Sequence, residues 1–442
     1  MAEEITDGVK IDNKNAFFKD LFSIPKSLLI VYLTTLLMRA SFYLALSILN
    51  YPYYLTHLSR LQKDIIFIVY PLSELLTVMF FGILSDKIGR KSIYYFGLGL
   101  TGLAIFLFSV FEQFGLLIFA SVFFGIGAAA QVASTLAMVA DVSPEGKRGR
   151  FMGFYDAMTL LGLGLGFGLG FLVMEVLFGK YDENTVPLNE VTNVATWMLM
   201  AATIMILVAL FIAVTVLKNT TFRTSKAEAV PLSDRLEFIV KDKALRYLMP
   251  IWVPIICLYA IVLTNAQELA QQLNLHDIKL LLVLAIIFGS ILIGFPLNGM
   301  LSDKIGRKPF LYIGMISFAA FVSLLVFGAN KAQQGDPNYL LYMSPALLIV
   351  GIGCGAFPPA ALALLSELSP KENYGTSMGA YSVVYGTGMI IGPLLATFSR
   401  TLGSDSGIGD IWGLIILVWI LCIISVLGTL LLPHHLLKKY SK

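Results

Sequence analysis

The stretch GILSDKIGRK, residues 82–91, occurs again almost unchanged as GMLSDKIGRK, residues 299–308. The two decapeptides differ only at Ile83, which is replaced by Met300. A longer match follows each of them, because segments 125–166 and 351–392 share several glycines and a Ser-Pro pair at a constant spacing. The chain therefore contains two homologous halves that run in the same direction.

The composition indicates that these halves lie in a membrane. Of the 442 residues, 57% are hydrophobic and only 13% are charged, whereas soluble domains have about 25% charged residues. Apolar runs such as 116–139 and 194–217 reach the roughly 20 residues that a helix needs to cross the hydrocarbon core. We expect an all-α membrane protein with twelve transmembrane helices, at 27–50, 64–85, 92–111, 115–140, 150–177, 193–217, 247–266, 279–301, 308–328, 340–366, 374–399 and 411–433.

The basic residues predict which side of the membrane each loop faces. Of the 31 Lys and Arg residues, 24 lie on the face that holds both termini. Cytoplasmic loops are enriched in Lys and Arg, so we expect both termini in the cytoplasm and the protein in the plasma membrane. The predicted parts are a cytoplasmic N-terminal segment (1–26), a six-helix bundle (27–217), a cytoplasmic linker (218–246), a second six-helix bundle (247–433) and a cytoplasmic tail (434–442).

The repeated decapeptide has the residues of a helix–helix contact. Gly82 allows the second helix to approach a neighbour closely, and Gly89 permits a tight turn. Asp86 is placed to meet the positive N-terminal end of another helix, and Arg90 can reach Asp141 at the end of the fourth helix. An alternative interpretation is that the basic residues only hold the loop on the cytoplasmic side.

The pattern G-x-L-S-D-K-x-G-R-K, present once in each half, resembles the signature loop of the major facilitator superfamily. The resemblance covers essentially the whole chain. It implies two pseudo-twofold-related six-helix bundles that move a solute by alternating access. It also implies a cytoplasmic gate of two equivalent sets of residues, which are Asp86, Arg90 and Asp141 in the first half and Asp303, Arg307 and Glu367 in the second.

Spaced glycines mark the fifth and eleventh predicted helices. They are Gly153, Gly162, Gly166 and Gly170 in the fifth, and Gly388 and Gly392, followed by Pro393, in the eleventh. Small residues four apart allow helices to pack closely in lipid, and we expect this packing to join the two halves. The spacing in the fifth helix resembles the motif of drug/proton antiporters, but Phe167 and Phe171 replace a proline and a glycine of that motif.

Ionisable residues inside the predicted helices are candidate functional groups, because a charge in the membrane is costly. Arg39 and Glu74 are expected near the middle of the membrane. Either they form a static ion pair, or Glu74 exchanges a proton while Arg39 binds an anionic group or tunes the pKa of Glu74. Asp156 is either a second protonation site or a partner of the nearby basic residues, and Gln131 is expected to line the cavity.

The second half has no such charge at this depth. It offers aromatic residues instead, and Tyr381 and Tyr385 share one helix face because they are four residues apart. Together with Tyr259, they suit an amphipathic organic substrate or simple packing.

These features favour a proton-coupled secondary transporter, either an antiporter or a symporter, for a small organic solute. Efflux of amphipathic compounds fits the glycine-rich fifth helix. Uptake or exchange of an organic anion or sugar-like solute, and flipping of lipid or lysolipid, stay open as alternatives. The sequence has no phosphate-binding nucleotide loop, and its four histidines lie at helix ends or in loops. We therefore expect no enzyme activity, cofactor, metal or nucleic-acid partner, and a monomer in the bilayer.

Overall fold

The computed structural model describes residues 24–51, 53–178, 185–217, 237, 241–264, 278–334 and 339–431. Across these residues the chain is helical and has no strand. Most of the predicted N-terminal segment, linker and tail lie outside the described residues. The helices of the first half are α2 (Lys26–Leu49), α3 (Arg60–Ile88), α4 (Arg90–Val110), α5 (Phe114–Val142), α6 (Arg148–Phe178) and α7 (Leu188–Val216).

The second half repeats this order. Its helices are α9 (Lys243–Thr264), α11 (Ile278–Ile305), α12 (Arg307–Gln333), α13 (Tyr339–Cys354), α14 (Phe357–Leu368), α15 (Tyr374–Asp405) and α16 (Asp410–Leu431), with a short 3₁₀ turn, η2 (Lys371–Asn373), before α15. In the described part of the chain, 11 helical spans are long and apolar enough to cross a membrane, and α9 has a shorter apolar part, Arg246–Val262. The all-helical membrane fold predicted from the sequence is confirmed.

The tenth predicted span is broken, which the sequence analysis did not predict. We expected one helix at 340–366, but α13 ends at Cys354 and α14 begins at Phe357. Pro358 and Pro359 explain the break, because proline lacks the backbone N–H and its ring clashes with the carbonyl four residues earlier. Gly355 lies in the gap, where a Cβ atom would overlap the backbone of Gly294 in α11.

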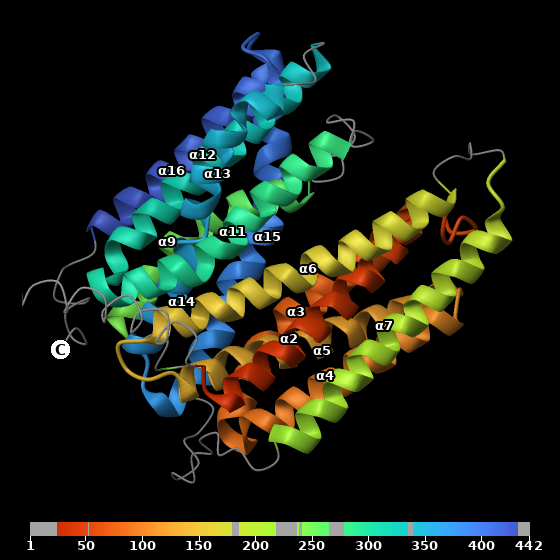
Figure 1. Ribbon diagram of the computed structural model, residues 1–442, viewed down its shortest axis with the longest axis horizontal. Helices are drawn as coiled ribbons and strands as arrows, with labels where there is room; N and C mark the ends of the chain where they lie inside the picture. Colours follow the sequence, from red (N-terminus) through yellow and green to blue (C-terminus); the bar gives the residue numbers. More distant parts are fainter. Residues whose placement is uncertain are drawn as a thin grey trace, which may run out of the picture.

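Figure 1 shows the two bundles side by side, with α6 beside α11 and α15 beside α3. Both decapeptides lie at the same end of the molecule, which we call the repeat-loop end. There the backbones of the two halves touch, since a Cβ atom at Gly149 would overlap the carbonyl of Gly299 and one at Gly82 would overlap that of Gly375.

Away from this end the halves separate. Along α6, a Cβ atom at Gly164 would still touch the Phe288 ring of α11, whereas Gly168, one turn further on, has nothing within 4 Å. Gly289 of α11 likewise has nothing within 4 Å. The ribbons diverge in the same direction (Figure 1). This structure is therefore closed at the repeat-loop end.

The predicted packing of glycines across the halves is wrong for most of them. Gly153 does pack on Phe295 of α11, in the other half. The remaining glycines pack within their own half, with Gly162, Gly166 and Gly170 of α6 against α2, and Gly388 and Gly392 of α15 against α9. Pro393 lies inside α15. The four-residue spacing predicts a small-residue face, but in helices that are apolar on all sides it does not determine which neighbour that face meets.

Candidate functional site

Asp86 connects the first half to the start of α15 in the second half. Its carboxylate accepts hydrogen bonds from the backbone N–H groups of Gly375 at 2.9 Å and Thr376 at 2.8 Å, and from the Thr376 hydroxyl at 2.6 Å. The first N–H groups of a helix have no intrahelical partner and carry a positive partial charge. A buried carboxylate at this position is therefore both hydrogen-bonded and electrostatically stabilised.

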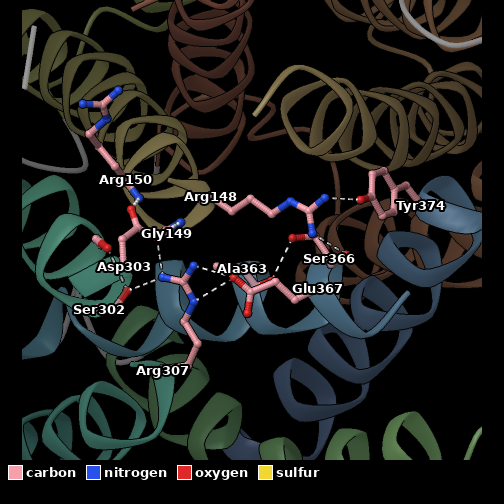
Figure 2. Close-up of polar contacts among 11 residues, drawn as sticks. Arg148, Gly149, Arg150, Ser302, Asp303, Arg307, Ala363, Ser366, Glu367 and Tyr374 are labelled. Atoms are coloured by element: carbon pink, nitrogen blue, oxygen red, sulfur yellow. Dashed lines mark hydrogen bonds and ion pairs between the residues drawn. The ribbon is translucent and has the colours of Figure 1, made fainter. Parts of the chain in front are cut away.

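Asp303 makes the equivalent contact in the opposite direction (Figure 2). Its two oxygens accept hydrogen bonds from the backbone N–H groups of Gly149 at 2.8 Å and Arg150 at 2.9 Å, at the start of α6. Each half thus places one aspartate on the N-terminus of a helix in the other half.

Two arginines hold these aspartates in place. Arg90 contacts Asp86 and also donates from Nε to Asp141 at 3.1 Å. Arg307 contacts Asp303 and donates from Nε to Glu367 at 3.1 Å. Each arginine therefore bonds both the decapeptide aspartate and an acid at the end of the α5 or α14 helix, which are the partners expected from the sequence.

The decapeptide glycines have separate geometric roles. Gly89 joins α3 to α4 with φ of 107°, a backbone conformation that residues with a Cβ atom rarely adopt. Gly306 has the same role in the second half, with φ of 110°. Gly82 instead allows α3 to touch the backbone of α15 at Gly375.

Arg148 connects the two halves through hydrogen bonds that the sequence analysis did not predict. It donates from Nη1 to the carbonyl oxygen of Ser366 at 3.0 Å and from Nη2 to the hydroxyl group of Tyr374 at 2.5 Å. Figure 2 shows its guanidinium group between these two residues. The repeat itself holds a signal, because Arg148 and Tyr374 stand at equivalent positions of the two halves, immediately before Gly149 and Gly375.

Arg39 in α2, Glu74 in α3 and Asp156 in α6 are charged residues that lie away from the ends of their helices, and we call them the central charged cluster. All three are partly exposed. Arg39 and Glu74 interact electrostatically, but within the described residues no member of the cluster has an oppositely charged group within 4.0 Å. Nε of Arg39 and Oδ2 of Asp156 are buried without a hydrogen-bond partner.

Tyrosines from both halves surround this cluster. Tyr259 of α9 and Tyr381 and Tyr385 of α15 interact electrostatically with Asp156. Tyr385 also interacts with Arg39 and Glu74. Tyr259 stacks on Phe318 with ring centroids 3.9 Å apart, and its hydroxyl group has no hydrogen-bond partner within the described ranges.

Sequence reasoning missed three further tyrosines of this region, namely Tyr43, Tyr70 and Tyr155. Each interacts electrostatically with members of the central charged cluster. Helical spacing would have found two of them, since Tyr43 is four residues after Arg39 and Tyr70 is four residues before Glu74, and residues four apart share a helix face.

Gln131 does not belong to this group. Its amide donates hydrogen bonds to the Gly97 carbonyl at 2.8 Å and to the Thr101 hydroxyl at 2.6 Å. The side chain is completely buried between α5 and α4. The expectation that Gln131 lines the cavity is therefore wrong, because at this position its polar group pairs with the neighbouring helix.

This arrangement combines a cation with two carboxylates, none of which has an ion-pair partner among the described residues. An arginine without such a partner can hold an anionic group, and a carboxylate without a cation partner in a membrane interior favours its protonated form. In the described part of the chain, no three His, Cys, Asp or Glu side chains come together in a way that could hold a metal ion.

Comparison with protein families gives one match across both halves. The model of the Major Facilitator Superfamily matches residues 28–286 and again residues 258–441.

Curated relatives include transporters of several solutes. A probable 4-methylmuconolactone transporter of Cupriavidus pinatubonensis is 27% identical over 365 residues, which cover 80% of this chain and 77% of that protein. Multidrug resistance protein 3 of Bacillus subtilis is 33% identical over 135 residues, 30% of this chain but only 24% of the relative. Quinolone resistance protein NorA of Staphylococcus aureus is 30% identical over 153 residues, 34% of this chain and 39% of the relative.

Solved structures show the same fold at low sequence identity. A variant of the E. coli fucose:proton symporter FucP has a TM-score of 0.69 and 13% identity, with 91% of this chain and 97% of that chain covered. The human organic anion transporter MFSD10 has a TM-score of 0.64 and 15% identity, with 93% and 100% covered. FucP in the outward conformation has a TM-score of 0.65 and 13% identity, with 91% and 99% covered.

Proposed function

This chain belongs to the Major Facilitator Superfamily, and from that premise we propose that it couples movement of a small organic solute to movement of protons. It is a multi-pass membrane transporter and not an enzyme. The observation that carries the proposal is the central charged cluster, in which Glu74 and Asp156 lie within the spans, are partly exposed and have no cation within 4.0 Å among the described residues.

Glu74 and Asp156 are the proposed proton carriers. A carboxylate without a cation partner is costly to keep ionised inside a membrane. Its proton affinity therefore depends on its surroundings, and a change in these surroundings can make it bind a proton on one side of the membrane and release it on the other. The tyrosines of α9 and α15 that face the cluster belong to the other half. Rocking of the halves would therefore alter the environment of both carboxylates.

The gate is the second part of the proposal. The networks of Asp86 with Arg90 and of Asp303 with Arg307 close the repeat-loop end, which we assign to the cytoplasm of a plasma-membrane protein because most basic residues lie there. The transport cycle then requires these contacts to break and re-form. We further propose that the transporter works as a monomer, because each gate contact and the central charged cluster are formed within a single chain.

The substrate class has two candidates. Relatives named for drug resistance support efflux of amphipathic compounds, which would bind against the tyrosines. Uptake or exchange of an organic anion has two observations in its support. One is a relative named as a probable 4-methylmuconolactone transporter, and the other is that Arg39 has no ion-pair partner in the described part of the chain. A third possibility, lipid or lysolipid flipping, has no specific observation in its favour.

Transport in proteoliposomes with an imposed pH gradient tests proton coupling. The probes are a lipophilic aromatic cation and an aromatic carboxylate, both radiolabelled. We expect Glu74→Gln, Asp156→Asn or both to abolish the response of transport to the gradient, while Glu175→Gln, near the other end of α6, keeps it. Full gradient dependence in both the Glu74 and the Asp156 variants would overturn the proton assignment.

The two probes also separate the substrate classes. If the solute is an organic anion, Arg39→Gln should lose carboxylate transport, and Arg39→Lys should keep part of it because the charge remains. If the solute is an amphipathic cation, removing the Arg39 charge should not reduce its transport. Carboxylate transport that is unchanged in Arg39→Gln would exclude Arg39 as the anion-binding residue.

A further inference from the structure

A cavity of about 590 Å³ opens at the repeat-loop end, away from the central charged cluster. Both halves form its walls. Asp141, Ser143, Glu145 and Arg148 come from the end of α5, the loop after it and the start of α6. Lys371 and Tyr374 come from η2 and the start of α15. Its volume lies within the range of about 300–1,000 Å³ that is typical of small-molecule sites.

The cavity lining holds two acids, Asp141 and Glu145, and two bases, Arg148 and Lys371, but Arg148 contacts neither acid directly. Asp141 receives a hydrogen bond from Arg90 at 3.1 Å, and Glu145 pairs with Lys371 at 3.1 Å. Arg148 has no carboxylate within 4.0 Å among the described residues, and its acceptors, Ser366 and Tyr374, are neutral.

Arg148 is also strongly buried, with only 5% of its surface exposed. Its Nε atom has no hydrogen-bond partner among the residues that the structure describes. A buried charge is costly unless a counter-charge compensates it. Among the described residues, Glu145 attracts the Arg148 charge but lies beyond 4.0 Å, so the guanidinium group can bind a closer anion.

Lys371 can supply a second cation at little cost. Its ion pair with Glu145 is exposed, with 48% and 77% of the two side chains accessible, and exposed pairs contribute little to stability. The Lys371 ammonium group can therefore turn from Glu145 to another anion in the same cavity.

We propose that this cavity is a binding site for a phosphate group, held by Arg148 from one half and by Lys371 and Tyr374 from the other. The planar guanidinium group suits phosphate oxygens, and the tyrosine hydroxyl adds a polar contact. The volume leaves space for an organic group attached to the phosphate. Both a soluble phosphate compound and the headgroup of an anionic lipid have this chemistry.

Two binding experiments on the purified full-length protein distinguish these sources. In the first, inorganic phosphate is titrated by calorimetry into protein in phosphatidylcholine nanodiscs, with chloride at equal ionic strength as reference. In the second, thermal stability is compared between phosphatidylcholine and phosphatidylglycerol nanodiscs. Binding in the first experiment identifies a soluble phosphate, and stabilisation in the second alone identifies a lipid headgroup. An absence of both effects would overturn the site.

Variants show whether the effect arises in this cavity. Lys371→Gln removes a charge at a surface position and should weaken phosphate binding, or the lipid-dependent stabilisation, about tenfold. Lys304→Gln is the matched control, because Lys304 is exposed and does not line the cavity. Equal effects of the two variants would show non-specific attraction and contradict the proposal. Arg148→Lys, which keeps the charge but loses the planar fork, should also weaken binding.

The site should exist only while the repeat-loop end is closed, since its walls come from both halves. Asp86 does not line the cavity, so Asp86→Asn should weaken binding by reducing the closed population. Affinity that stays at the wild-type value in Asp86→Asn, although that variant opens this end, would show that the ligand does not bridge the halves.

Discussion

Asp86 Oδ2 accepts two hydrogen bonds from Thr376, one from the backbone N–H at 2.8 Å and one from the hydroxyl group at 2.6 Å. The equivalent bond in the other half joins Asp303 to Arg150, but only through the backbone, at 2.9 Å. The two closing contacts are thus related by the repeat but are unequal, because Thr376 adds a side-chain donor that Arg150 does not.

This inequality predicts how single substitutions affect the closed state. Asp86→Asn and Asp303→Asn should each favour opening of the repeat-loop end, because a neutral amide interacts less with a helix N-terminus. Hydrogen bonds to a charged group contribute about 1.5–3 kcal/mol, and we expect the larger effect for Asp86. Distances between spin labels on the two halves, measured by electron paramagnetic resonance, report the shift. An equal or larger effect of Asp303→Asn would contradict the predicted inequality.

The Thr376 hydroxyl group can be tested by itself. Thr376→Val keeps the shape and the backbone N–H but removes a hydrogen bond to a carboxylate, so it should favour opening by about 1.5–3 kcal/mol. The same spin-label distances measure it, and Thr401→Val, at an exposed position of α15, serves as control. A Thr376→Val protein with the wild-type distance distribution would show that the backbone bonds alone hold this contact.

Glycine contacts along α6 provide a steric prediction. Gly149→Ala should separate the halves, because its Cβ atom would overlap the carbonyl of Gly299 and overpacking costs about 1–3 kcal/mol. Gly168→Ala is the matched control in the same helix, since nothing lies within 4 Å of a Cβ atom there. Only Gly149→Ala should lower thermal stability and change the spin-label distances, since Ala is tolerated well at an open helix position such as 168. Equal losses of stability in both variants would contradict this account.

Gln131 should be important for stability and not for substrate binding. Gln131→Ala removes two buried hydrogen bonds between α5 and α4 and leaves a cavity, so it should destabilise the protein by about 2–3 kcal/mol. Thermal unfolding gives the loss of stability, and transport at permissive temperature gives the apparent affinity. A changed KM with unchanged stability would instead place Gln131 at the substrate.

Glu145 provides a pH-dependent prediction. Its pKa lies below the ordinary value, because Lys371 donates a hydrogen bond to it and because Lys371 and Arg148 attract its charge. A carboxylate whose pKa is lower in the folded than in the unfolded protein stabilises the folded state at pH values above its unfolded pKa, which is about 4.3 for Glu. This stabilisation is lost as the pH falls through the pKa of the folded state. The difference in Tm between wild type and Glu145→Gln should therefore be small but present at pH 7 and absent at low pH. A difference that grows towards low pH would contradict the pairing.

The sequence predicted the spans and the gate partners because their causes are local or repeated. A hydrocarbon core requires apolar runs of about 20 residues, and such runs are directly readable. The contacts of Asp86, Arg90, Asp303 and Arg307 could be predicted for two reasons. The decapeptide occurs twice, and the family loop that it resembles implies a partner for each of these residues. The break before Phe357 was not predicted although its prolines are visible in the sequence, because a long apolar run is typical of one continuous transmembrane helix.

What the sequence determined by itself is therefore an all-helical membrane protein of two repeated halves, with charges placed within its spans. Only the tertiary structure decided which helix faces meet. It placed Gly162 against α2, buried Gln131 against α4, brought tyrosines of the second half to Asp156, and joined Arg148 to Tyr374. The physical reason is that these helices are apolar on nearly all sides, so their sequences lack the polar stripe that distinguishes an inner face from an outer one.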